Sequence, residues 1–361
     1  MKLLLLPYVI QKEVFDHFNG NEILLFSMSS KNVQNLILFN QKSRFAGIEY
    51  SLSQSSTNVQ SIHRSRHDST LLSIVPRFGA DCATERNISG MPVQLLMANS
   101  RHQLVALHND PVPMLFEDSH VHAEASHMSK ITEAVHEYIN SFLGNRTEYY
   151  LDVNSIYDFS TSPAIHSLPA LKNIKGATIQ GKTIKAELLE KVFSVPADNY
   201  HIVLDAWIVG ELSERSALFN AESLTISAQR NDKVSKILAH FNGKRLHIKI
   251  DEDASLRVIE FLNGWKSNED VGRYLECLTA RPFTNQNVPR TFSHVDQIQD
   301  LVGIKKLEDT HPELIINRTE KTRNYIVRER DGRVAAVLVT RSAIHFQQTD
   351  WTEKELLGDT Q

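Results

Sequence analysis

Cysteine is the scarcest of the chemically informative residues in this chain. Only Cys82 and Cys277 are present, and they lie far apart in the sequence. This scarcity gives no support to a disulfide framework or to a cysteine-based zinc site. We therefore expect an intracellular protein, cytoplasmic or nuclear, without a structural metal.

An excess of positive charge is missing as well. The chain has 39 basic and 43 acidic residues, a net charge of −4, whereas nucleic-acid binding domains are usually basic. No apolar run approaches the roughly 20 residues that a membrane-spanning helix needs. Neither nucleic acid nor membrane is therefore an expected partner.

Recognisable catalytic signatures are also few. No Gly-x-Ser-x-Gly elbow is present, so a hydrolase triad has no anchor. His120, His122 and His127 flank acidic residues in an expected loop, whereas zinc requires ligands on rigid elements. We interpret this stretch as a solvated loop, and we predict no catalytic residue, no metal ligand and no cofactor.

The length and composition predict an ordinary folded protein of several domains. With 361 residues, 41% of them hydrophobic, the chain can bury two or three cores. Changes in pattern along the sequence divide it into three parts. We place them at residues 1–45, 46–128 and 129–350.

The first forty residues predict three short helices. Pro7 suits a first helical turn, and Ile10, Val14 and Phe18 then recur at helical spacing. A second helix follows from Glu22 to about Met28, and a third carries Val33, Leu36 and Ile37 on one face. Helices of two or three turns need tertiary packing, and so much apolar surface on so small a unit indicates a docking site.

The order of residues in this segment resembles an F-box. The resemblance is carried by Leu6-Pro7, Glu13-Val14-Phe15, Ile23-Leu24 and Ser29-Ser30-Lys31. It implies packing against a Skp-type adaptor, which connects an F-box protein to the cullin scaffold of a ubiquitin ligase. The residues that it places in the apolar contact are Leu6, Pro7, Ile10, Val14 and Leu24.

The second part, residues 46–128, predicts a small β-rich region. Short alternating segments separated by turn-forming residues favour strands at Gly47–Leu52, Leu71–Val75, Val93–Met97 and Leu104–His108. The polar, serine-rich segment from Gln54 to Ser69 is interpreted as a surface loop.

The third part, residues 129–350, alternates strands and helices. A helix from about Ser129 to Phe142 leads into strands that recur about every 25 residues, with helical stretches between them. The pairs of apolar strand residues are Leu151 and Val153, Ala177 and Ile179, Ile202 and Leu204, Leu224 and Ile226, Leu246 and Ile248, and Leu275 and Cys277. This interval predicts a leucine-rich-repeat-like βα solenoid. A doubly wound α/β sheet would show the same alternation.

Alternation along these strands predicts the residues that face outward. A repeat solenoid presents its parallel strands on one side as a binding surface. The predicted substrate contacts are Asp152, Thr178, Gln180, His201, Thr225, His247, Lys249 and Glu276, with Cys277 facing inward.

The C-terminal segment predicts a β-hairpin. Asn324–Arg330 and Arg333–Val339 are the strands, Asp331-Gly332 suits a two-residue type I′ turn, and Ala343–Phe346 can add a third strand. The whole chain thus predicts an α/β protein with an N-terminal three-helix unit, a β-rich region, a βα solenoid and a final hairpin.

Two stretches of this last part carry a second resemblance. RVIEFLNGWKSNEDVGRYLECL (257–278) and ERDGRVAAVLV (329–339) are similar to hallmark stretches of the F-box-associated type 2 domain. That domain accompanies an N-terminal F-box in a nematode family of proposed substrate receptors. The resemblance implies a non-catalytic subunit of a Skp–cullin–F-box ubiquitin ligase, which binds a protein substrate of unknown identity.

Two alternatives stay open at the sequence level. GATIQGKT, Gly176–Thr183, matches the P-loop pattern, in which Lys182 would meet phosphates and Thr183 a magnesium ion. Against a nucleotide site, Ala177 and Ile179 keep the register of a repeat strand. The other alternative is a repeat scaffold outside any ligase, whose N-terminal helices serve only as a cap.

Overall fold

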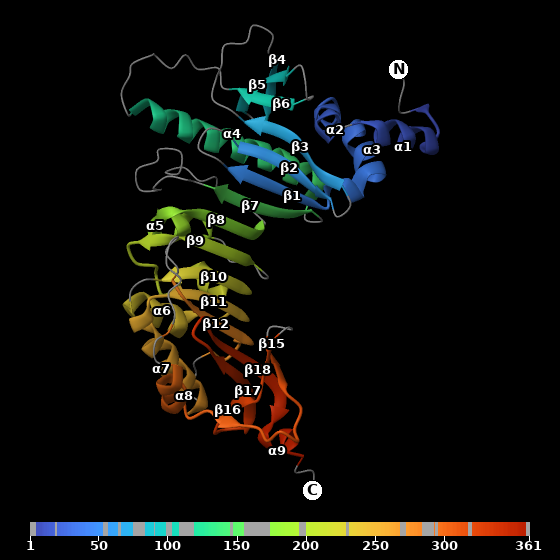
Figure 1. Cartoon of the computed structure of the whole chain (residues 1–361). Helices are drawn as coiled ribbons and strands as arrows, with labels where there is room; N and C mark the ends of the chain where they lie inside the picture. Colours follow the sequence, from blue (N-terminus) through green and yellow to red (C-terminus); the bar gives the residue numbers. More distant parts are fainter. Residues whose placement is uncertain are drawn as a thin grey trace. The chain divides into compact units, whose positions relative to one another are not determined.

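The computed structural model describes residues 5–18, 20–52, 57–63, 66–74, 84–89, 91–98, 103–107, 119–144, 147–154, 174–194, 200–228, 231–267, 272–283, 292, 295–316 and 320–358. The chain divides into two compact units, Met1–Lys182 and Thr183–Gln361. Both units contain helices and strands. Along the chain, short N-terminal helices come first, then mostly parallel strands with interleaved helices, and last an antiparallel region (Figure 1). The predicted α/β class is confirmed.

Three short helices begin the first unit, as predicted. They are α1 (Tyr8–His17), α2 (Gly20–Ser27) and α3 (Lys31–Gln41), and a single 3₁₀ turn, η2 (Lys42–Phe45), follows. Ser30 caps α3, because its Oγ accepts a hydrogen bond from the backbone N–H of Val33 at 3.3 Å.

The sheet of the first unit combines parallel and antiparallel pairs. Strands β8, β7 and β1 are parallel neighbours, β2 and β3 continue antiparallel from β1, and β6, β5 and β4 complete the order. Their bounds are β1 (Gly47–Leu52), β2 (Thr57–His63), β3 (Arg66–Ile74), β4 (Thr84–Ile88), β5 (Met91–Ala98), β6 (Gln103–Leu107), β7 (Glu148–Asn154) and β8 (Ile174–Lys185).

The interpretation of Gln54–Ser69 as a loop is wrong, because β2 and the first half of β3 lie within it. These two strands pair antiparallel, with shifts of register near Val59 and near Ser61. Each shift moves later side chains to the opposite face of the strand. The segment is extended, but its apolar and polar residues no longer alternate with the period of two that identifies a strand.

Helix α4 (Ser119–Leu143) is longer than predicted and includes the histidines assigned to a loop. Its C-terminal half carries the predicted apolar face, with Ile131, Val135 and Ile139 buried. The N-terminal half is polar, so periodicity gave no helical signal there. The helix also brings His136 Nδ1 to 3.0 Å from the Tyr50 hydroxyl in β1.

In the second unit, parallel strands follow one another in chain order. These are β9 (His201–Val209), β10 (Ser223–Ala228), β11 (Arg245–Ile250) and β12 (Cys277–Pro282). The helical segments are α5 (Ala186–Val192), η5 (Ala217–Asn220), α6 (Asn231–His240), η6 (Glu252–Ala254), α7 (Ser255–Lys266) and α8 (Val295–Val302). Helices α6, α7 and α8 lie on one face of these strands (Figure 1).

Backbone hydrogen bonds join the start of each parallel strand to the turn before the preceding one. Ser223 N–H donates to Tyr200 O at 3.0 Å, Arg245 N–H to Glu222 O at 2.9 Å, and Cys277 N–H to Lys244 O at 3.0 Å. The turns therefore stack closely. A Cβ at Gly243 would lie 1.8 Å from Ala221 O, so only glycine fits between two such turns.

An antiparallel layer completes the second unit. Its strands are β13 (Lys305–Lys306), β16 (Asn324–Val327), β17 (Arg333–Val339) and β18 (Ile344–Thr352), and β18 pairs with β12. The two-stranded sheet of β14 (Leu314–Ile316) and β15 (Glu320–Thr322) packs against β17, and α9 (Glu353–Leu356) follows β18. Leu314, Ile316, Val334, Ala336 and Leu356 share a buried cluster there.

The predicted hairpin exists, but its two-residue turn is wrong. Strand β16 ends at Val327, and the loop is closed by hydrogen bonds from Arg328 N–H to Arg333 O and from Gly332 N–H to Arg328 O, each 2.9 Å long. Only Gly332, with φ of 66°, adopts the left-handed conformation among the described residues of this loop, whereas a type I′ turn requires two.

Two glycine substitutions should differ sharply in their effect on stability. Gly243→Ala drives a Cβ into backbone and should lower the free energy of unfolding by about 3 kcal/mol. Gly332→Ala meets no atom within 4 Å, so it should cost only about 1 kcal/mol for its positive φ. Urea unfolding of both variants measures the difference, and equal losses would contradict the stacked-turn geometry.

Candidate functional site

Five large apolar side chains are exposed together on the N-terminal helices. Their exposed fractions are 74% for Leu5, 49% for Tyr8, 70% for Val9, 47% for Ile10 and 73% for Phe39. We call them the N-terminal apolar surface. Isolated exposed apolar residues are ordinary, but four of these five fall within six successive residues and the fifth, Phe39, contacts Tyr8, and such a group indicates an interaction site.

Contacts between α1 and α3 hold this surface in place. The rings of Tyr8 and Phe39 meet edge to face, with 5.3 Å between their centroids. Gln41 Nε2 donates to Asp16 Oδ1 at 2.7 Å, and Arg44 donates to the Phe15 carbonyl at 3.2 Å. Since Phe15 is fully buried, α1 turns its other face outward.

The structure separates the five predicted adaptor contacts. Pro7 and Ile10 are exposed, and Leu6 and Val14 are partly exposed. Leu24 is only 2% exposed, because α2 packs against β3 and β6, so its assignment as a surface contact is wrong. Sequence reasoning missed Leu5, Tyr8, Val9 and Phe39, although the leucine run before Pro7 was a signal for the first of them.

Helix α2 has a structural role in the first unit. The Ser27 and Tyr138 hydroxyls are 2.8 Å apart, and Gln34 Nε2 donates to the Tyr138 hydroxyl at 3.0 Å. Tyr138 belongs to α4, so these bonds fix α2 and α3 on the body of the unit. The N-terminal helices therefore cap this unit on one side and leave α1 exposed on the other.

The outward positions predicted in the first unit lie on one face of its parallel strands. Asp152 and Thr178 are register partners in β7 and β8, and Gln180 lies two residues farther along β8. All three are partly or fully exposed. Burial raises the pKa of the Asp152 carboxyl. Their part in substrate binding stays a prediction.

In the second unit, four predicted positions lie on the strand face opposite the helices. His201 is exposed, and Thr225, His247 and Lys249 are partly exposed. We call this side the open strand face. Glu276 is exposed but precedes β12, in the turn.

Cys277 is buried, as its interpretation as a small core residue predicted, but it lies on the other face of the strand from the one expected. Its register partner is Arg245, so Cys277 lies on the open strand face with Thr279 and Arg281. Leu275, interpreted as its strand companion, lies in the turn before β12, and this displaced the predicted alternation by one residue. Burial raises the pKa of the Cys277 thiol, so the neutral thiol is favoured.

Basic side chains gather on the open strand face, some with acidic partners. Lys249 Nζ lies 2.7 Å from Asp205 Oδ1, and Arg245 lies 3.3 Å from Glu222 Oε1. Burial, reinforced by the positive charges of Arg281, His345 and Arg245, lowers the pKa of His247. The carboxylates that pair with Lys249 and Arg245 therefore do not cancel the effect of the basic groups around His247.

A hydroxyl, an imidazole and a carboxylate form a chain beside these residues. His345 Nδ1 lies 3.1 Å from Thr279 Oγ1, and His345 Nε2 lies 3.3 Å from Glu320 Oε2. The arrangement matches the order of groups in a hydrolytic triad. Thr279 is only 1% exposed, however, so its hydroxyl is not accessible to a substrate. The two contacts instead provide polar partners for both ring nitrogens of the buried His345.

The segment that matches a P-loop is a strand. Gly176–Thr183 lies entirely within β8, which continues to Lys185. A phosphate-binding loop must curl its backbone N–H groups around the anion, whereas those of a strand point alternately to either side. The nucleotide-site alternative is therefore contradicted, and the extended interpretation of Ala177 and Ile179 is confirmed.

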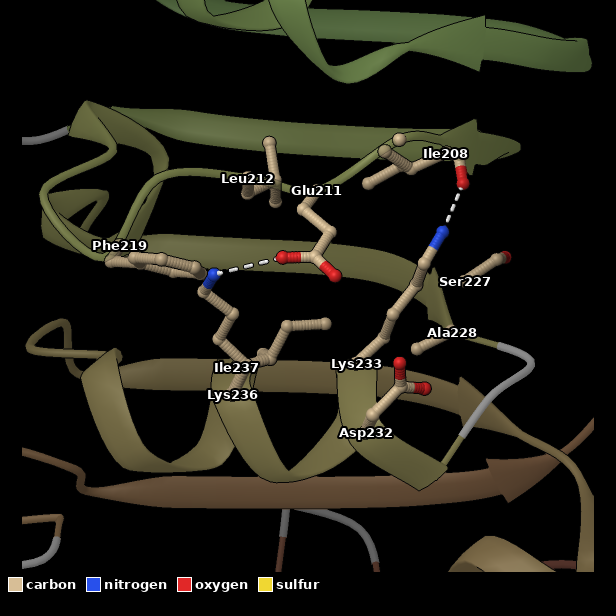
Figure 2. A pocket seen from close by; sticks show the side chains of 11 residues that line it. Ile208, Glu211, Leu212, Phe219, Ser227, Ala228, Asp232, Lys233, Lys236 and Ile237 are labelled. Atoms are coloured by element: carbon tan, nitrogen blue, oxygen red, sulfur yellow. Dashed lines mark hydrogen bonds and ion pairs between the residues drawn. The ribbon is translucent and has the colours of Figure 1, made fainter.

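A pocket of about 160 Å³ opens between α6 and the carboxyl ends of β9 and β10 (Figure 2). Its apolar walls are Ile208, Leu212, Phe219 and Ile237. Lys233 Nζ donates to the Ile208 carbonyl, and Lys236 Nζ lies 3.9 Å from Glu211 Oε2 across the opening. The pocket can accept a compact apolar group, and the ionisable side chains in its lining are Glu211, Asp232, Lys233 and Lys236.

Comparisons of this chain with models of known families, with curated proteins and with solved structures find no match. Within the described ranges, no group of three or more potential ligand residues could hold a metal ion. No helix among the residues that the structure describes has the length and apolar character required to cross a bilayer.

The burial of His345 predicts a pH-dependent stability. Burial lowers its pKa, although Glu320 acts in the opposite direction. The unfolded chain then binds more protons between the lowered pKa and about 6.5, so stability is complete above this range and declines as the pH falls through it.

We expect the loss of unfolding free energy between pH 8 and pH 5 to be smaller for His345→Gln than for the wild type. Urea unfolding at each pH measures it. His201→Gln, at an exposed position, serves as the control and should keep the wild-type dependence. An unchanged dependence in His345→Gln would contradict the prediction.

Proposed function

We propose that this protein is a substrate-recognition subunit of a Skp–cullin–F-box type ubiquitin ligase. The observation that carries the proposal is the N-terminal apolar surface, exposed on a helical unit whose sequence resembles an F-box. The chain itself performs no chemistry in this role. It holds a substrate near the ubiquitin-loaded enzyme and so raises the effective concentration of the reacting groups.

The adaptor is proposed to cover the N-terminal apolar surface. Burying each of these side chains contributes about 1.5–3 kcal/mol, enough for a few of them to anchor an interface. Val9 and Ile10 stand on a helix that is held in place by the buried ring of Phe15 and by the Asp16–Gln41 hydrogen bond. The surface is therefore preorganised, which reduces the entropic cost of association.

The substrate is proposed to bind the parallel-strand region. Strands β9 to β12 follow chain order with their helices on one face, which supports the finer interpretation as a leucine-rich-repeat-like solenoid. In a doubly wound sheet the strand order would reverse and helices would cover both faces. In a solenoid, the face of the parallel strands that the helices do not cover serves as the binding surface.

The cap interpretation is the second candidate, and the bonds of Ser27 and Gln34 to Tyr138 favour it. Those bonds show that α2 and α3 stabilise the first unit. They do not involve the exposed face of α1, so the same experiment distinguishes a cap alone from a cap that also docks an adaptor.

We expect the double variant Val9→Asp/Ile10→Asp to bind a purified Skp-type adaptor at least about tenfold more weakly than the wild type. Two carboxylates would have to lose their water in the interface. Co-purification and titration calorimetry measure the effect, and thermal unfolding establishes that the variant is folded.

Leu301→Asp provides the matched control. Leu301 is an apolar helical residue in α8 and is 57% exposed, so the substitution adds one such carboxylate in the other unit. It should leave adaptor binding unchanged. Absence of adaptor binding by the wild type, or equal binding by the double variant, would refute the proposed function.

A further inference from the structure

One arginine on the open strand face has no acidic partner. Arg281 is exposed in β12, and within the described part of the chain it makes no ion pair or hydrogen bond. Its register partner in β11 is Lys249, whose ammonium group is held by Asp205 at 2.7 Å. The two cationic side chains thus stand on adjacent strands, and the carboxylate that holds Lys249 comes from β9, on the side of β11 away from Arg281.

A second arginine and an imidazole lie on the same face as Arg281. His247 lies two residues before Lys249 in β11, and Arg245 two residues before that, all on the same face. Arg245 Nε is buried without a hydrogen-bond partner among the described residues. Two of the nearby carboxylates are engaged elsewhere, because Glu222 pairs with Arg245 and Lys244, and Glu320 with His345.

The spacing of these residues suits an extended peptide. Arg245 and Lys249 are four residues apart on one strand, on the order of 13 Å, and β12 lies about 4.8 Å away. Acidic side chains at alternate positions of an extended segment project to one side at about 7 Å intervals. Such a segment therefore places one anionic group near Arg281 and, two alternate positions or about 14 Å farther along, another near Arg245.

We propose that the open strand face around Arg281 binds an acidic segment of a protein substrate, through carboxylate or phosphate groups. The proposal rests on the proposed substrate-receptor function and specifies its substrate class. Arg281 supplies a guanidinium that suits bidentate contact with either anion. Arg245 and Lys249, each already near a carboxylate, set the direction of the segment along β11.

The test uses the full chain and fluorescent peptides, with binding followed by anisotropy. One peptide alternates glutamate with serine, a second replaces each glutamate by glutamine, and a third carries phosphoserine at the alternate positions. We expect the acidic or the phosphorylated peptide to bind and the amide peptide not to bind. Binding should weaken as the salt concentration rises.

Arg281→Gln should weaken binding of the anionic peptide about tenfold. Arg257→Gln is the matched control, because Arg257 is a partly exposed arginine on α7 whose partner is Glu260 at 2.8 Å. This control should bind as the wild type does. Equal weakening by the two variants would show diffuse charge attraction and overturn the proposal.

Two further results would also overturn it: failure of every anionic peptide to bind, or binding of a single-stranded oligonucleotide alone. The adaptor titration is independent of this face, and Arg281→Gln should retain adaptor binding. A chain that binds adaptor but no anionic peptide would thus refute only this inference. The opposite result would refute the proposed ligase function.

Discussion

Backbone hydrogen bonding between successive strand entries is the constraint on which the second unit depends. Each of β10, β11 and β12 begins with an N–H that donates to a carbonyl in the turn before the preceding strand. A unit of strand and helix cannot complete these bonds by itself, so it is stable only against its neighbours. Gly243 follows from the same constraint, since two stacked turns leave no space for a Cβ above Ala221 O. The parallel order, the turn sequence and the placement of the helices are thus consequences of one repeated contact.

This packing also determines which surfaces are available for binding. The helices α6 to α8 occupy one face of the parallel strands, and the opposite face carries polar and charged residues such as Lys249 and Arg281. Toward the C-terminus, β14 and β15 cover the equivalent face of β17 with a buried apolar cluster. In the first unit, α1 exposes the apolar side chains of Val9 and Ile10. The proposed adaptor and substrate surfaces therefore differ in chemistry, one apolar and one charged, which allows them to select different partners.

Regular periodicity made much of this fold predictable from the sequence. The three N-terminal helices and the strands at Gly47–Leu52 and from β7 to β11 were placed correctly, because their apolar residues recur at helical or strand spacing. Strand β2 was missed where its register shifts disrupt the alternation, and one misplaced leucine reversed the predicted orientation of Cys277. The apolar stripe of α1 predicted a docking face, but it could not show that Leu24 is buried. Which of these side chains are buried depends on tertiary packing. The same packing determines which basic side chains lie together on the open strand face.

The edge strand of the second unit, β13, consists of Lys305 and Lys306 alone. It stands at the end of the strand order and pairs only with β16. An edge so short offers few free backbone groups, and an incoming strand would have to desolvate two ammonium groups to reach them. Lys305 is in addition held by Glu353 at 2.8 Å. This edge therefore resists extension into intermolecular β-sheet, and it protects a chain with so much parallel strand from self-association at its C-terminal end.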